Sequence, residues 1–130
     1  MLADDSRQGD RVSTSSRFLT TTENQLSGYE IVERMGVVRG IAVRSRSIFG
    51  LIGAKLQQLG GGEITLLTEL CEHARADAFA LAVQHAEALG ANALVAIRYD
   101  ATEIMSGVSE VLCYGTAMRV ISNESAARNP

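Results

Sequence analysis

Two segments near the end of the chain, residues 93–103 and 108–121, constrain the fold most, because each predicts a strand that is apolar on both sides. Side chains alternate between the two faces of a strand, so one set is normally apolar and the other polar. In the last segment one set is Leu112, Tyr114, Thr116, Met118 and Val120, and the other is Val111, Cys113, Gly115, Ala117, Arg119 and Ile121. In the segment before it, the sets are Ala93, Val95, Ile97 and Tyr99 against Leu94, Ala96, Arg98 and Asp100. Both faces of this sheet therefore need an apolar cover.

A long helix is predicted before these strands, over residues 63–89. Its core stripe follows steps of three and four residues through Leu67, Cys71, Ala74, Ala78, Leu81, His85 and Leu89, with Phe79, Val83 and Ala86 on a second flank. Gly90 follows the last turn, where a left-handed C-terminal cap is expected. The pattern predicts a helix that packs along one face of the sheet.

The first half of the chain predicts shorter elements. Residues 18–22 favour a short extended piece, and residues 29–43 favour one strand, or two strands joined at Gly36 or Gly40. Glycines inside a strand indicate a bulge or a close backbone approach. Residues 45–59 predict a short amphipathic helix, which the glycines at 60–62 end. The order predicts an α+β fold, an antiparallel sheet packed against one long helix plus a short helix.

Length and composition indicate one domain. The chain has 130 residues, of which 46% are hydrophobic, and this is typical of a globular protein with its own core. Residues 1–17 and 122–130 are polar and are predicted to be disordered tails. We therefore expect a single domain over residues 18–121.

The predicted domain has more apolar surface than one helical layer can cover. One helix covers one sheet face, so the second face needs another subunit, and the sequence predicts a homo-oligomer. The alternative is that the short helix at 45–59 and the N-terminal strand cover the second face within the same chain.

Charge and cysteine content exclude several classes of protein. The net charge of −3 argues against a general nucleic-acid binder, and no apolar run approaches the roughly 20 residues that span a membrane. The N-terminal residues lack the apolar stretch of a secretory signal, so we expect a cytoplasmic protein. In that compartment Cys71 and Cys113 are expected to be reduced, with one disulfide between them as the alternative.

Few residues offer metal or catalytic chemistry. Cys71, His73, His85 and Cys113 match no zinc spacing, and we expect Cys71 to be a packed thiol and His85 a core histidine that is hydrogen-bonded to the backbone. Glu69, His73 and Asp77 share one helical face and could hold a divalent ion, the alternative being an exposed polar face.

Two further features could attract anions. Gly60, Gly61 and Gly62 precede a helix, but a hinge explains them better than a phosphate loop, since the usual lysine and hydroxyl residue are missing. Arg39, Arg44 and Arg46 form a basic cluster that is read as solvated surface or as an anion site in a cleft between subunits. No serine elbow or triad is present, so we assign no catalytic, cofactor-binding or metal-ligating residue.

Several stretches resemble the YbjQ-like family of bacterial proteins, which is often labelled as heavy-metal-binding. They are TTT near the start, EIVERMGVVRG, GGGE before the long helix, LGANALVAIRYD and YGTAMRV. The resemblance covers about residues 18–121 and is most specific at LGANA and YGTA. It implies a small α+β protomer, similar in layout to a dodecin subunit, that assembles as a ring, and a pentamer in particular.

The resemblance implies no catalytic residue. Many relatives carry a cysteine where this chain has Met35, and Leu66 and Leu67 stand where the family has an aromatic residue, so ligand roles at those positions do not carry over. The sequence thus predicts a non-enzymatic homo-oligomeric binding or scaffold protein whose ligand is unknown. The alternative is a heavy-metal-binding or metal-responsive protein that uses Cys71, Cys113 or the Glu69, His73 and Asp77 face.

Overall fold

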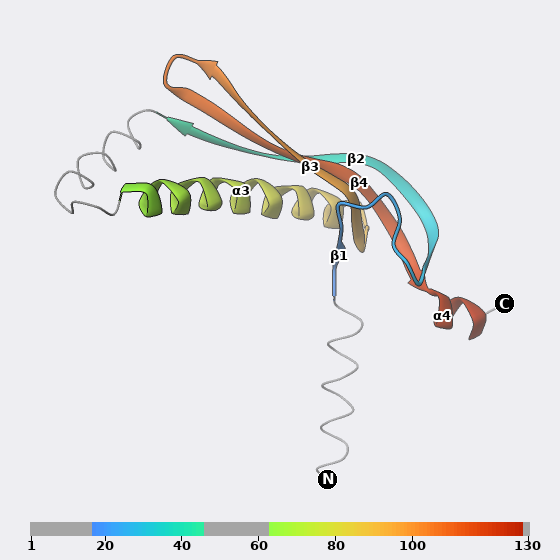
Figure 1. Cartoon of the computed structure of the whole chain (residues 1–130). Coiled ribbons are helices and arrows are strands. Elements are labelled where there is room, and N and C mark those ends of the chain that lie inside the picture. The colour runs from blue at the N-terminus through green and yellow to red at the C-terminus, as the bar shows by residue number, and fades with distance from the viewer. Residues whose placement is uncertain (1–16, 46–62, 129–130) are drawn as a thin grey trace, which may run out of the picture.

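A computed structural model describes residues 17–45 and 63–128 and confirms the predicted α+β class (Figure 1). The elements are β1 (Leu19–Thr20), β2 (Tyr29–Ser45), α3 (Glu63–Ala88), β3 (Ala93–Met105), β4 (Val108–Ser122) and α4 (Asn123–Arg128). The strands form one sheet in the order β1-β3-β4-β2, and the sheet arches over α3 (Figure 1). The predicted short helix at 45–59 and the glycines at 60–62 lie outside the described residues, apart from Ser45, which ends β2.

The sheet is mixed rather than purely antiparallel. β4 pairs antiparallel with β2 and with β3, whereas β1 runs parallel to β3 over two residue pairs. Within the predicted C-terminal tail, α4 continues directly from β4. The Ser122 hydroxyl accepts a hydrogen bond from the Ser125 backbone N–H at 3.2 Å and so caps this helix.

β2 is one strand, and its two predicted special glycines have different roles. Gly36 has a φ of +91° and lies at one of the two register shifts against β4, so it marks a bulge. Gly40 faces α3, where an added Cβ would clash with the backbone of Ala78 and Ala82 and would lie 2.8 Å from the Leu81 Cβ. Gly40 therefore marks a close approach of helix and strand.

This close approach explains why the predicted helical stripe is partly wrong. The buried stripe of α3 consists of Ala74, Ala78, Ala82 and Ala86, at steps of four residues. Leu81 and Leu89, which the sequence placed on the stripe, are 43% and 47% exposed. Alanine leaves room for the helix backbone to reach the sheet at Gly40, whereas Leu81 borders Gly40 only with its Cβ and Leu89 follows the end of the helix. Leu67 has no described side chain.

The second sheet face is covered at one end by the chain itself. Leu19, Leu26 and Ile31 pack against a cluster formed by Ala93, Val95, Met118 and Val120. Farther along this face Val37 is 73% exposed, and Ile41 and Val43 are also exposed. The N-terminal segment therefore covers part of the face, as the alternative prediction held, and leaves the rest open in the described part of the chain.

A bulge in β3 decides which of its side chains face the helix. Ala96 has a positive φ of 54°, and the register against β4 shifts between Val95 and Arg98. Val95 consequently belongs to the outer cluster, whereas Ile97 joins the core below α3. The sequence had placed both residues on the same face.

Candidate ligand groove beside the long helix

A groove lies between the first half of α3 and the β3–β4 hairpin. It encloses about 200 Å³ and is lined by Arg44, Leu70, Cys71, Ala74, Arg75, Ala101, Ser109 and Val111. Most of these side chains are apolar or small, and the two arginines supply positive charge. The groove can therefore hold a small apolar group beside an anionic one.

Arg44 on the groove wall forms an ion pair with α3. Arg44 Nη2 donates to Asp77 Oδ2 at 2.5 Å, and the arginine side chain is 19% exposed. His73 Nε2 lies 3.7 Å from the same carboxylate oxygen. Asp77 is thus committed to Arg44, and in the described part of the chain no group of three or more His, Cys, Asp and Glu side chains could hold a metal ion. The predicted metal face with Glu69 is not assembled.

The two thiols differ in their surroundings and both are free. Cys71 is exposed on the groove wall, so its predicted packing is wrong. The reason is the alanine stripe, which turns Cys71 out of the core. Cys113 is buried below α3 in contact with the main core cluster.

Tyr99 and Cys113 face each other across β3 and β4. They are partners in the strand register, and their side chains are hydrogen-bonded. Burial raises the pKa of the Cys113 thiol. Burial also raises the pKa of Tyr99, and the charged form of Cys113 adds to the rise, against a smaller opposing effect of Arg75. Both groups thus keep their protons at neutral pH, and Cys113 is a poor nucleophile.

Sequence reasoning missed Tyr99, which pairs with Cys113 and is not among the lining residues of the groove. Its role depends on the bulge at Ala96, which moves Tyr99 to the helix side of the sheet. The one signal in the sequence was an aromatic residue two positions after Ile97 in a strand rich in β-branched residues.

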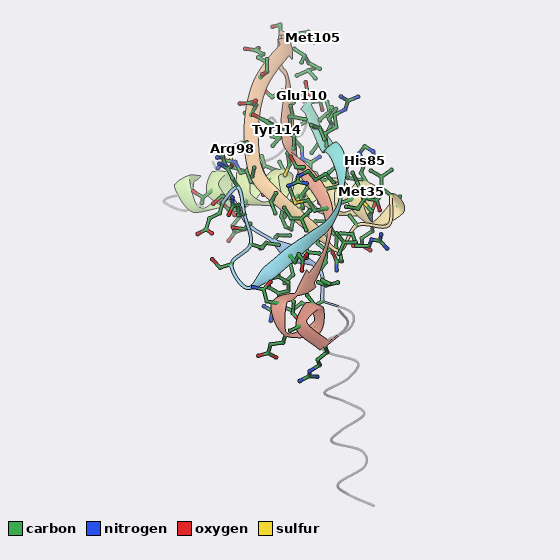
Figure 2. The ribbon with its side chains drawn as sticks, turned by 90° about the vertical axis from the view of Figure 1, so that its right-hand side faces the viewer. Met35, His85, Arg98, Met105, Glu110 and Tyr114 are labelled. Atoms are coloured by element: carbon green, nitrogen blue, oxygen red, sulfur yellow. The ribbon has the colours of Figure 1, made fainter. Side chains whose placement is uncertain are left out.

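His85 is hydrogen-bonded to the backbone as predicted, but it is exposed rather than buried. Its Nδ1 accepts a hydrogen bond from the Arg39 backbone N–H at 3.3 Å, and so it ties α3 to the edge strand β2. Figure 2 shows His85 on the same side of the molecule as Met35, opposite Arg98. This bond gives His85 a structural role.

The predicted basic cluster is dispersed. Arg44 lies on the helix side with Asp77, whereas Arg39 pairs in register with Tyr114 and is exposed. Arg46 and the glycines at 60–62 lie outside the described residues. Over residues 17–45 and 63–128, no helix is long and apolar enough to cross a membrane.

Comparisons with known proteins give a family and few further details. Residues 18–121 match the model of the YbjQ-like family, whose description is "Putative heavy-metal-binding". A UPF0145 protein of Solibacter usitatus is 56% identical over 101 residues, which are 78% of this chain and 90% of that protein. One from Chromobacterium violaceum is 51% identical over 112 residues, which are 86% and 96% of the two chains. Neither of these names states an enzymatic activity.

A solved structure supports the fold. A protein of unknown function from Pediococcus pentosaceus, assigned to the DUF74 family, has a TM-score of 0.52 and 18% identity to this chain. The match covers 80% of this chain and 98% of that protein.

Proposed function

Because the chain belongs to the YbjQ-like family of bacterial proteins, we propose that it is a non-enzymatic homo-oligomeric binding or scaffold protein that forms a pentameric ring. We place it in the cytoplasm, where its two free thiols stay reduced.

The uncovered sheet face carries this proposal. Val37, Ile41 and Val43 are exposed on β2, and Leu112 and Tyr114 lie beside them on β4. Their side chains share the face opposite α3, since their strand positions alternate with the buried ones. An exposed apolar surface of this kind, here interrupted by Arg39, marks a protein contact, and a second copy of the chain is the partner we propose.

The free strand edges support a ring rather than a two-fold dimer. β2 ends the sheet on one side, and from Arg98 onward no described strand pairs with the outer edge of β3. These two edges differ, so a contact between one edge of a subunit and the other edge of the next is head-to-tail. Such contacts form a ring when the rotation between neighbouring subunits closes.

Native mass spectrometry tests the assembly. We expect an oligomer of five times the chain mass of 13.9 kDa. Ile41→Glu should shift it to smaller species, because a charge would enter the apolar contact. Leu89→Glu is the matched control, since Leu89 is similarly exposed just after the end of α3. A wild-type monomer at micromolar concentration would contradict the proposal.

The second candidate function is heavy-metal binding. The family description and the exposed Cys71 on the groove wall support it. Because no three ligands meet in the described part of one chain, the site would need ligands from neighbouring copies. Wild type and Cys71→Ser should then differ in stoichiometric zinc, copper or nickel content. Equal, negligible metal content and no thermal shift with these ions would exclude this function.

A further inference from the structure

We propose that a second cavity, on the sheet face opposite α3, binds a small carboxylic acid with an apolar tail. The cavity encloses about 340 Å³, and its lining residues are Gln25, Leu26, Tyr29, Ile31, Arg34, Val95, Met118 and Val120. All of them belong to one chain, so the proposal does not depend on the number of subunits.

The floor of the cavity is apolar and well packed. Val95, Met118 and Val120 are at most 7% exposed, and they form the outer core cluster with Leu26 and Ile31 along the wall. No buried side-chain nitrogen or oxygen of the described residues lacks a partner, so the floor offers no polar group to a ligand. The part of a ligand that reaches this floor must therefore be apolar.

The rim of the cavity is polar and carries one positive charge. Gln25, Tyr29 and Arg34 are exposed on the lining, and among the described residues no carboxylate pairs with Arg34. The nearby Glu33 is engaged by Arg119, whose Nη2 lies 3.2 Å from Glu33 Oε2. A guanidinium without a partner beside an apolar chamber favours a carboxylate, because its N–H groups match the two carboxylate oxygens.

The turn that forms one wall is held at both ends. The Ala96 N–H donates to the Glu23 carbonyl oxygen at 2.8 Å, and the Asn123 N–H donates to the Gly28 carbonyl oxygen at 2.9 Å. The backbone N–H of Tyr29 donates to the Leu26 carbonyl oxygen at 3.3 Å inside the turn. The cavity is therefore preformed, which lowers the cost of binding.

Methyl NMR on the full-length protein as purified tests this site. Octanoate is the probe, because it joins a carboxylate to an apolar tail. We expect the Met118 methyl signal to shift in a saturable way, while Met105 at the hairpin tip stays unchanged (Figure 2). Equal shifts of both methyls, or no shift with millimolar octanoate, would overturn the proposal.

Two comparisons distinguish the contribution of the octanoate carboxylate to binding from that of its apolar tail. Arg34→Gln should weaken octanoate binding about tenfold or more, whereas Arg39→Gln, which removes an exposed arginine of the same strand outside the cavity, should not. Octanol and inorganic phosphate should each bind more weakly than octanoate. An Arg34→Gln variant that binds like wild type, or phosphate that binds as well as octanoate, would refute the assignment. Native mass spectrometry measures the subunit number independently. A negative result for octanoate binding would therefore not contradict the proposed ring.

Discussion

The side-chain amide of Asn92 pairs with the backbone of Val120 in the way that a strand residue would. Asn92 Nδ2 donates to the Val120 carbonyl oxygen at 2.9 Å, and its Oδ1 accepts from the Val120 N–H at 2.8 Å. The Asn92 backbone also bonds to Met118 and Leu19. One residue thus joins β1 and β4 immediately before β3 begins.

Replacing Asn92 should therefore destabilise the fold. Asn92→Ala leaves both the N–H and the carbonyl of Val120 without the side-chain partner, and we expect a loss of about 2 kcal/mol in the free energy of unfolding. Urea denaturation measures this loss. Asn123→Ala, at an exposed position on α4, is the control and should stay within about 0.5 kcal/mol of wild type. Coincident curves for Asn92→Ala and wild type would contradict the role of the amide.

Gly40→Ala should be more damaging than any change at an unobstructed glycine. The Cβ added at Gly40 would meet the α3 backbone at Ala78 and Ala82, which cannot move without displacing the helix. We therefore expect the free energy of unfolding to fall by about 3 kcal/mol or more. Gly28→Ala is the control. Gly28 has a φ of +84° with open space around it, so only backbone strain of about 1 kcal/mol should appear. Equal melting temperatures of the two variants would argue against the close approach.

The elements with strong local signals could be predicted from the sequence. The long helix, the cap at Gly90 with a φ of +91°, the hairpin strands and the special glycines of β2 all agree with the structure. Hydrophobic periodicity and the backbone conformations of glycine are local properties of a few neighbouring residues. The sequence of one segment is therefore enough to predict such an element.

The candidate site could not be predicted as well, because it depends on contacts between distant segments. The face of α3 that is buried depends on Gly40 in another element, and the face on which Tyr99 lies depends on a positive φ at Ala96, an unusual conformation for alanine. The pairing of Arg44 with Asp77 joins residues 33 positions apart. No local pattern encodes these relationships.

The two thiols should react at very different rates. Cys71 is exposed and Cys113 is buried, so a thiol reagent such as Ellman's reagent should modify one thiol quickly and the second only on unfolding. Cys71→Ser should remove the fast phase. The reverse result, a fast phase that survives in Cys71→Ser and disappears in Cys113→Ser, would place the wrong thiol at the surface.

The ion pair between Arg44 and Asp77 should couple more strongly than the exposed pair between Arg119 and Glu33. The Arg44 side chain is largely shielded from solvent, whereas both partners of the second pair are about half exposed. Double-mutant cycles with alanine should give a coupling free energy of about 1 kcal/mol between Arg44 and Asp77, and of less than about 0.5 kcal/mol between Arg119 and Glu33. Added salt should weaken the exposed pair more. A larger coupling for the exposed pair would count against this comparison.

Stability should fall at alkaline pH because of Tyr99 and Cys113. Both have a pKa in the folded protein above the ordinary values of 10.0 and 9.0, so at high pH the unfolded chain loses these protons first. The unfolded state then binds fewer protons than the folded state, and the free energy of unfolding decreases as pH rises. Below about pH 8 both states keep these protons, and the two groups contribute no pH dependence.

Urea unfolding between pH 7 and 10.5 measures this effect. Cys113→Ala should flatten the alkaline decline, because it removes one buried acid and the charge that acts on Tyr99. Cys71→Ala, which removes an exposed thiol, should leave the decline as in wild type. If both variants follow the wild-type profile, the buried pair of Tyr99 and Cys113 is not what limits stability at high pH.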